Sequence, residues 1–251
     1  MAIVPFSGLS TGANMVFWIS KEMSCPMCQS RLLGREVGGG FALGQDSDLL
    51  VRIKGKHIIQ AEIHSCQTCR YSGFTKDFLI NCLPEIATEF RTQVTPILTG
   101  VPGAPQASTP FPDLQYLWAY QSALFLKRPA LTLGLLLLRA YWCLRLPPTS
   151  NLPAKEMEKR KQKYLPLCIE HLRQSLRGSR NPHLYYLLGE LSRRMGNFDD
   201  STAYFEKFLT RPQGAHYLQL ATMKLLSAAR DRDGREKTME ELLYDHKTES
   251  F

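Results

Sequence analysis

The sequence predicts an α+β protein in which a small β-rich module comes first and an all-α stack of helical hairpins follows. The first 95 residues contain clustered glycines and short alternating apolar runs, which are typical of strands and turns. Residues 113–232 instead carry apolar residues at helical spacing, interrupted by prolines and glycines. The first region also contains two C-x-x-C pairs, a pattern that indicates a bound metal ion holding a small module together.

The composition bounds the class of protein. The chain has 251 residues, a formal net charge of +8 and 44% hydrophobic residues, enough for a globular protein with a real core. The first 19 residues are apolar but lack the positively charged start of a secretion signal, so they do not resemble one. The lipid-like run from Ala130 to Leu138 is far shorter than the roughly 20 residues that cross a bilayer. Seven cysteines, an odd number, argue against a secreted disulfide framework, and we expect a cytoplasmic protein without membrane contact.

Within the N-terminal module, the alternating runs over 49–53 and 58–63 predict two strands joined by a hairpin turn at 54–56. Residues 75–90 have helical spacing, although Pro84 restricts where that helix starts or breaks. The zinc-ribbon-like module, with this trailing helix, is expected to occupy residues 1–98.

The two C-x-x-C pairs, Cys25–Cys28 and Cys66–Cys69, predict a metal site. Each pair places two thiolates on one tight turn, and together they complete a tetrahedral shell at about 2.3 Å from a shared ion. Such a shell leaves no open position for a substrate or an activated water, so a structural Zn²⁺ is favoured. Iron uses the same four ligands and stays an alternative. The 37 residues between the pairs must form a hairpin or small sheet of their own.

Other candidate site residues have weaker patterns. His57 and His64 are possible additional ligands, but His64 is better explained as a contact outside the ligand shell. Asp46 and Asp48 form a possible carboxylate pair, for which an exposed acidic turn is the favoured explanation. The three remaining cysteines are expected to fill the core rather than act as nucleophiles; they are Cys82, Cys143 and Cys168.

The second half of the chain is expected to be helical. Residues 99–112 are rich in Pro, Gly, Ala and Ser and predict a linker. The α-helical region follows over 113–232, and a charged tail over 233–251 is expected to fray. Helical spacing predicts six helices, over 113–126, 129–146, 156–176, 183–195, 199–209 and 214–230. Pro166 is expected to kink or split the third of these.

Residues 183–209 predict two antiparallel helices with a very short connection, which form a helical hairpin. The spacing of six residues resembles a tetratricopeptide repeat; they are Tyr185, Leu188, Gly189, Gly196, Phe198 and Phe205. Gly189 is expected to let the helices approach closely and Gly196 to allow the turn, while both phenylalanines fill the groove. Ser192, Ser201, Phe208 and Pro212 depart from the repeat pattern.

The order of the motifs resembles the bacterial family known as domain of unknown function 2225. The resemblance rests on CPMC at 25–28, the Asp46–Asp48 segment, HSCQTCRYSGF at 64–74 and LTLGLLLLRAYW at 131–142. It implies a two-knuckle, zinc-binding N-terminal region joined to a tetratricopeptide-like helical region, and it implies no reaction. Gln29 and Arg70 stand where such knuckles often have glycine, so both turns are expected to hold a positive φ under strain.

Taken together, these patterns predict a non-enzymatic, zinc-stapled scaffold that binds a protein or peptide on its helical region. No phosphate loop, nucleophile elbow or other catalytic motif is present, and no small-molecule substrate is indicated. The alternative is a nucleic-acid-binding protein that uses a basic helix over 155–180, where eight basic residues meet three glutamates. Against it, residues 1–100 are nearly neutral, with nine Lys or Arg and eight Asp or Glu.

Overall fold

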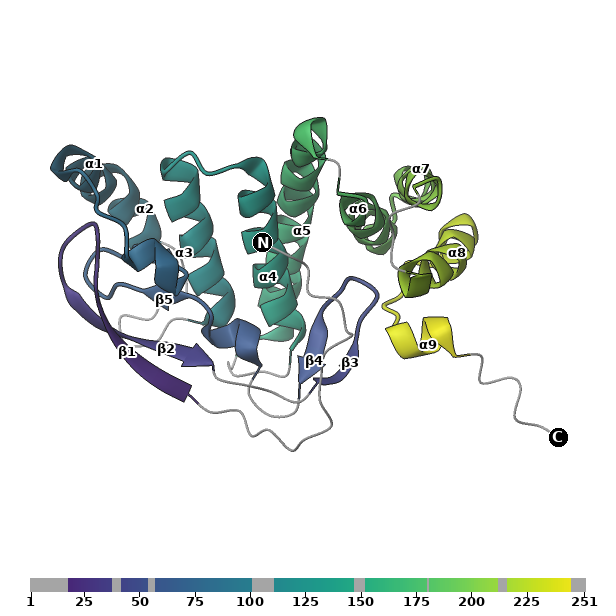
Figure 1. Cartoon of the computed structure of the whole chain (residues 1–251), viewed down its shortest axis with the longest axis horizontal. Coiled ribbons are helices and arrows are strands. Elements are labelled where there is room, and N and C mark those ends of the chain that lie inside the picture. The colour runs from purple at the N-terminus through teal and green to yellow at the C-terminus, as the bar shows by residue number, and fades with distance from the viewer. Residues whose placement is uncertain are drawn as a thin grey trace.

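The computed structural model describes residues 18–37, 42–53, 57–100, 111–146, 152–179, 181–211 and 216–244. Helices stand side by side in a long row, and the N-terminal strands lie along one side of that row (Figure 1). The predicted α+β fold class is confirmed.

Three two-stranded antiparallel sheets make up the strands of the described residues. They are β1 (Trp18–Ser24) with β2 (Arg31–Val37), β3 (Ala42–Gln45) with β4 (Val51–Ile53), and β5 (His64–Ser65) with β6 (Ser72–Gly73). The first and third pairs each enclose one C-x-x-C turn. The insert between the two turns contributes strands of its own, as expected.

One predicted strand is wrong. Residues Ile58–Ala61 form a 3-10 turn, η1, rather than part of a strand over 58–63. A half-buried strand would alternate buried and exposed side chains. All four side chains of η1 are instead partly buried. The turn is fixed instead by Tyr116, whose hydroxyl donates a 2.7 Å hydrogen bond to the Ile59 carbonyl. The hairpin turn predicted at 54–56 lies outside the described residues.

The helix predicted over 75–90 is divided. A 3-10 turn, η2 (Thr75–Phe78), comes first, and α1 (Pro84–Glu89) begins at Pro84. Proline suits the first helical position because its missing N–H would have no partner there. A π-helical turn, η3 (Phe90–Val94), then leads directly into α2 (Thr95–Thr99). Residues 101–110 of the predicted linker lie outside the described residues.

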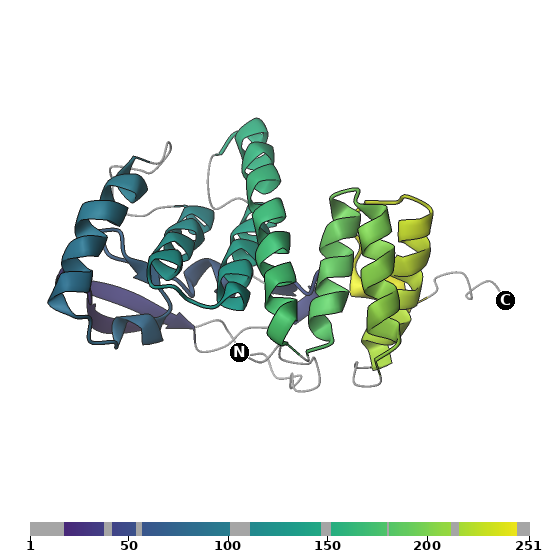
Figure 2. The ribbon, with the colours of Figure 1, turned by 90° about the horizontal axis from the view of Figure 1, so that it is seen from above.

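The six predicted helices of the second half are present, each to within two residues at either end. They are α3 (Pro112–Phe125), α4 (Ala130–Arg145), α5 (Ala154–Ser175), α6 (His183–Arg194), α7 (Phe198–Leu209) and α8 (His216–Arg230). Pro166 lies inside α5, which continues past it without a break. Seen from above, α5 to α8 run side by side (Figure 2). None of the described helices is long and apolar enough to cross a bilayer.

Helices α6 and α7 pack as the predicted hairpin. A Cβ on Gly189 would lie 2.6 Å from the ring of Phe205, so only glycine permits this approach. Gly196 has a φ of +78°, which an L side chain rarely adopts, and it makes the turn. Ser201, at a position that the repeat pattern gives to alanine, is buried and donates a 2.8 Å hydrogen bond to the Gly189 carbonyl. Phe198 differs from the expectation, because it is only half-buried and faces Arg232 and Gly234 outside the groove.

The tail that was expected to fray from residue 233 is ordered in its described part. Helix α9 (Met239–Leu243) is capped by Thr238, and Met239 and Leu242 are buried in the same hydrophobic cluster as α8. Thr238 also forms an isolated β-bridge with Asp46 of the N-terminal module. For residues 233–244 the expectation was wrong, because a T-x-x-E capping box, Thr238 with Glu241, stabilises this short helix.

Candidate metal centre

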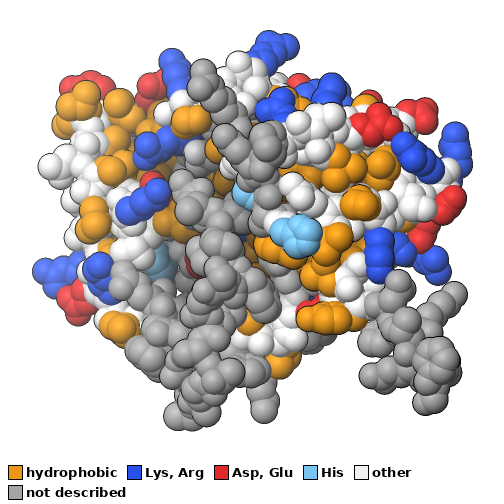
Figure 3. Space-filling view, turned by 45° about the vertical axis from the view of Figure 1, so that its right-hand side comes forward, with side chains coloured by type: hydrophobic (Ala, Val, Ile, Leu, Met, Phe, Trp, Pro, Cys, Tyr) orange, Lys and Arg blue, Asp and Glu red, His pale blue; other side chains and the backbone are white. Residues whose placement is uncertain are grey.

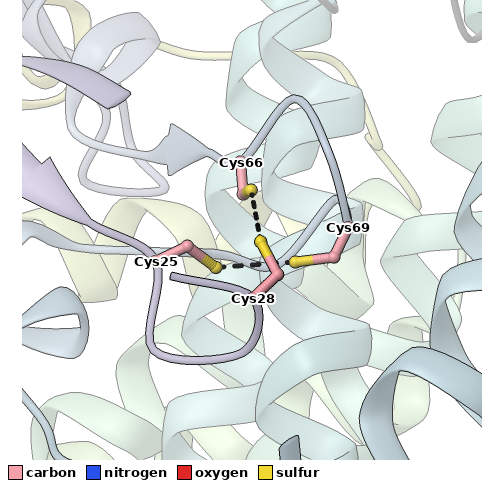
Figure 4. A group of neighbouring side chains, drawn as sticks. All are labelled: Cys25, Cys28, Cys66 and Cys69. Atoms are coloured by element: carbon pink, nitrogen blue, oxygen red, sulfur yellow. Dashed lines mark hydrogen bonds between the residues drawn. The ribbon is translucent and has the colours of Figure 1, made fainter. Parts of the chain in front are cut away.

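The four cysteines predicted as ligands come together in space. Their Sγ atoms all lie within 4.8 Å of one another, and the side chains converge from the two enclosed turns (Figure 4). Cys25 Sγ lies 3.5 Å from Cys69 Sγ, and Cys28 Sγ lies 3.4 Å from Cys66 Sγ. Four sulfur ligands around one point are able to hold a metal ion.

The two turns have the same backbone design. In the first, the Cys25 N–H donates to the Ser30 carbonyl at 2.9 Å and the Gln29 N–H donates to the Cys25 carbonyl at 2.9 Å. The second repeats these bonds at 2.8 and 3.0 Å with Cys66, Arg70 and Tyr71 in the equivalent places. The turns also touch through the hydroxyls of Ser30 and Thr68, which lie 2.9 Å apart. Two copies of one turn therefore face each other across the sulfurs.

Both turns hold a non-glycine residue in the left-handed region. Gln29 has a φ of 60° and Arg70 a φ of 61°, at the positions where glycine was expected to be favoured. Such a conformation costs a residue with a Cβ on the order of 1 kcal/mol. The predicted strain is confirmed at the backbone level.

The sulfur cluster lies in a hydrophobic core of its own. Tyr71, Phe90, Leu98 and Trp118 are fully buried in the same cluster as the cysteines. Trp118 comes from α3, so a helix of the second half contributes to the core around the sulfur cluster. The guanidinium of Arg70 lies 5.2 Å from the centre of the Trp118 ring.

The thiols influence one another strongly. Interaction with Cys25 lowers the pKa of Cys66 to about 2, and interaction with Cys66 raises the pKa of Cys25 to about 12. Interaction with Cys25 also raises the pKa of Cys69. One sulfur thus ionises readily while its neighbours stay protonated, because a thiol that donates a hydrogen bond to the adjacent thiolate stabilises both forms. A cation at the centre would stabilise the thiolate form at all four positions.

The two histidines do not join this group. His64 is buried, and its Nε2 lies 3.0 Å from the Thr75 hydroxyl, a contact outside the sulfur shell as expected. His57 is buried near Arg52, and burial lowers its pKa. Within the described part of the chain, the four cysteines are the one group of three or more His, Cys, Asp or Glu side chains placed to share a metal ion.

Comparison with known proteins places the chain in a family. The model of DUF2225, described as an uncharacterized protein conserved in bacteria, matches residues 18–234. The chain belongs to this family. No curated protein and no solved structure gives a significant match. The DUF2225 match begins at β1 and extends past α8, so it includes both cysteine turns and the row of helices from α3.

In this DUF2225 chain, the remaining cysteines lie apart from the sulfur cluster or beside it. Cys143 and Cys168 are buried in the large core, as expected. Cys82 is only partly buried, and its Sγ lies 3.8 Å from Met27 Sδ next to the sulfur cluster. Burial raises the pKa of all three thiols, which keeps them protonated and unreactive near neutral pH.

The acidic segment of the DUF2225 motif is not an exposed turn, so that expectation was wrong. Asp46 and Asp48 are buried, with 1% and 0% of their surface exposed. Asp48 pairs with Arg145 of α4 and with Arg194 of α6, the latter at 3.2 Å. Asp46 pairs with Arg145 and, at 2.7 Å, with Arg52. Their charges are therefore used within the fold rather than offered to a ligand.

A second part of this network was missed by the sequence interpretation. Glu190 of α6 is fully buried and accepts hydrogen bonds from Ser47 at 2.6 Å, Arg194 at 2.7 Å and Arg193 at 2.8 Å. Arg193 also donates to the carbonyls of Asp233 and Arg235, which holds the segment before α9 in place. The i, i+3 and i+4 spacing of Glu190, Arg193 and Arg194 could have predicted ion pairs along one face of the helix.

Proposed function

We propose that this DUF2225 protein is a non-enzymatic, cytoplasmic scaffold in which a structural zinc ion staples the N-terminal module and the helical region binds a protein or peptide. The four-cysteine shell supports the first half of this proposal. Four thiolates complete the coordination of a tetrahedral ion, so no position remains for a substrate or an activated water. In a reducing compartment, such thiols stay available for zinc rather than forming disulfides.

Zinc is preferred to iron for a physical reason. Both ions accept four sulfurs, but zinc has no redox chemistry. A role that consists only of holding the two turns together needs no redox-active ion. A purified chain with iron would absorb visible light through its thiolate bonds, whereas a zinc chain would be colourless.

The single observation that carries the binding proposal is a surface of tyrosine and arginine side chains on α5, α6, α7 and the residue Arg211 just after α7. Arg211 lies 4.2 Å from the centre of the Tyr185 ring, and its guanidinium donates a 3.0 Å hydrogen bond to the Tyr185 hydroxyl. Arg173 of α5 donates a 3.1 Å hydrogen bond to the Tyr204 hydroxyl of α7. The two rings lie 6.5 Å apart. We call these four residues the Tyr–Arg surface.

Tyr and Arg are the residue types that most often anchor protein interfaces, because they combine a large apolar area with directed hydrogen bonds. Each member of the Tyr–Arg surface is at least partly exposed. Their mutual contacts hold the side chains in place, so less side-chain entropy is lost when a partner binds. The surface is therefore suited to recognise a peptide or a protein.

The last helix of the row adds a second support. Leu220 and Met223 of α8 are 44% and 54% exposed, and their i, i+3 spacing puts them on one face. The side of the molecule that carries α8 shows hydrophobic side chains gathered between lysines and arginines (Figure 3). Terminal helices of repeat proteins usually have a polar outer face, so these apolar side chains favour a partner.

Affinity purification from the bacterial host, at moderate salt, tests the proposal. We expect a protein to copurify with the chain in stoichiometric amount and to be lost when Tyr204→Ser and Arg211→Ser are combined. Lys159→Ser on the exposed side of α5 is the matched control and should retain the partner. If no protein copurifies, or if the double variant retains it, the scaffold proposal is wrong in this form.

A second candidate, nucleic-acid binding, is favoured by one observation on α5. Lys155, Lys159 and Lys163 are exposed, and their i, i+4, i+8 spacing makes one stripe. Within the described residues none of the three has an ion-pair partner, whereas Arg160 on the same helix pairs with Glu156 and Asp113. Unpaired lysines in a row are able to follow phosphates.

A filter-binding titration with duplex and single-stranded probes decides between the candidates. Nucleic-acid binding predicts that affinity falls steeply as salt rises, and that replacing all three lysines by glutamine reduces the slope by about three phosphate contacts. Absence of binding at low salt would exclude this candidate and leave the scaffold proposal standing.

A further inference from the structure

A cavity of about 410 Å³ lies between the segment that follows the second cysteine turn and the α3–α4 hairpin. Tyr71 to Phe74, Lys76, Asp77 and Ile80 form one side, and residues of α3, α4 and their connection form the other. Its volume is in the range of small-molecule sites, about 300–1,000 Å³. None of the four clustered cysteines lines it, and none of the residues of the Tyr–Arg surface lines it.

The helices give the cavity an apolar lining. Ala119 and Ala123 of α3 and Leu131, Leu135 and Leu136 of α4 line it. Leu131 and Leu135 are only partly buried, so they keep apolar surface available to a ligand. This lining is suited to an alkyl chain or an apolar ring.

The charged lining is unbalanced. Lys76, Arg128 and Arg139 line the cavity together with one carboxylate, Asp77. Lys76 is exposed and has no ion-pair partner within the described residues. Arg128 is 40% exposed and lies 3.5 Å from Asp77 Oδ1, a loose contact. Cationic side chains beside an apolar lining favour a ligand with one anionic end.

The third cation is held more firmly. Arg139 Nε lies 3.3 Å from Glu62 Oε2, and the guanidinium lies 5.4 Å from the centre of the Phe74 ring. Glu62 does not line the cavity, so Arg139 is fixed from behind while it contributes to the lining. A guanidinium that is already oriented loses little entropy when it binds an anion.

A buried hydroxyl in the lining also has an unused proton. Ser122 is 1% exposed, and its Oγ accepts a 3.2 Å hydrogen bond from the Ser72 N–H. A hydroxyl both accepts and donates, and within the described residues the Ser122 proton has no acceptor. Leaving such a proton unpaired in a buried place is unfavourable, so an acceptor oxygen from a ligand would be stabilised there.

We propose that this cavity binds a small amphiphilic anion, an apolar chain or ring that ends in one carboxylate or phosphate group. The apolar end packs against the leucines of α4, and the anionic end is bound by Lys76 and Arg128, with Ser122 as a further donor. The assignment follows from the combination of apolar lining, excess positive charge and a donor without an acceptor. It does not depend on the protein-binding proposal.

Isothermal titration calorimetry on the full metal-loaded chain tests the assignment with decanoate, decyl phosphate and decylamine below their micelle-forming concentrations. We expect one decanoate or decyl phosphate per chain, and at least about tenfold weaker binding of decylamine, which has the same chain and the opposite charge. The two anions distinguish a carboxylate from a phosphate head group.

Three variants locate the site. Lys76→Gln and Arg128→Gln are each expected to weaken decanoate binding about tenfold, the effect of one charge-assisted hydrogen bond. Leu135→Glu should abolish it by placing a carboxylate among the leucines. Lys207→Gln removes the same charge from an exposed position on α7 and should change nothing. Because Lys76 is exposed and unpaired, its variant keeps the test valid even if Leu135→Glu fails to fold.

Several results would overturn the assignment. They are no binding of either anion, equal binding of decylamine, or unchanged affinity in both Lys76→Gln and Arg128→Gln. Circular dichroism of each variant verifies that lost binding is not lost folding.

Discussion

The indole Nε1 of Trp142 donates a 2.9 Å hydrogen bond to Asp48 Oδ2, although the two residues are 94 positions apart. Asp48 belongs to the segment before β4, and Trp142 lies near the end of α4. Arg145 and Arg194 face the same carboxylate, which is fully buried. One acidic side chain therefore joins the N-terminal module to two helices of the row.

Removing the charge of Asp48 should be strongly destabilising. Burial acts to raise its pKa, but the charges of Arg194 and Arg145 outweigh burial and hold the pKa below its ordinary value. Asp48→Asn leaves two buried guanidiniums without their main counter-charge, which should lower the free energy of unfolding by about 3 kcal/mol. Urea denaturation near neutral pH measures this difference.

Asp46→Asn is the matched control in the same network. Burial raises the pKa of Asp46 despite its arginine neighbours, so its ionised form contributes less to stability than that of Asp48. We expect Asp46→Asn to cost clearly less than Asp48→Asn. An equal or larger cost would contradict the assignment of Asp48 as the centre of the network.

The contribution of Asp48 should depend on pH in a defined direction. Its pKa is lower in the folded chain than in the unfolded chain, so its stabilisation is complete above the unfolded value of about 3.9. The contribution is lost as the pH falls through the lower, folded value. The difference in unfolding free energy between wild type and Asp48→Asn should stay constant from about pH 8 to about pH 5 and shrink below about pH 4. A difference that grows on acidification would contradict this account.

Gly189→Ala tests the close packing of α6 on α7. The added Cβ would lie 2.6 Å from the Phe205 ring, and such overpacking should cost about 1–3 kcal/mol in thermal or urea unfolding. Gly178→Ala is the control, because a Cβ there meets nothing within 4 Å. If both variants were equally stable, the hairpin would be less closely packed than the structure indicates.

Gln29→Gly should stabilise the first cysteine turn. Gln29 is exposed and has a φ of 60°, a conformation that glycine adopts without steric cost. After the entropy of the more flexible unfolded chain is subtracted, we expect a gain of about 0.5–1 kcal/mol. Gln29→Ala keeps the Cβ and should give no gain. Arg70→Gly is a poorer test, because it also removes the contact with Trp118.

The sequence was sufficient where a local pattern determines structure. Helical periodicity predicted α3 to α8, because their apolar faces repeat along each helix. The spacing of the cysteines predicted the two turns from which the four thiols come together, since each pair needs only its own turn. The missing glycines at 29 and 70 predicted the positive φ values.

It was insufficient where the structure depends on contacts between distant segments. Asp46 and Asp48 look like an exposed turn until Arg145 and Arg194 are brought to them from positions about a hundred or more residues away. The cavity beside the α3–α4 hairpin likewise combines separate segments. Residues 58–61 form a 3-10 turn because Tyr116 fixes the Ile59 carbonyl, a contact that no local pattern indicates.

These long-range contacts predict that the metal site and the helices unfold together. Trp118 of α3 is buried in the core of the sulfur cluster, and Asp48 joins the module to α4 and α6. Chelation should therefore reduce the helical circular dichroism at temperatures where the loaded chain is folded. Full retention of the helical signal after complete metal removal would show that the helical region is stable alone.

Metal content with stability tests the central claim most directly. The purified chain, measured by inductively coupled plasma mass spectrometry, should contain one zinc per chain. Cys→Ser at any of the four positions, Cys25, Cys28, Cys66 or Cys69, should lose the zinc and lower the melting temperature, because the binding energy of such a site is folding energy. Cys143→Ser should retain the zinc. A folded chain without bound metal, or zinc that is unaffected by these substitutions, would contradict the account.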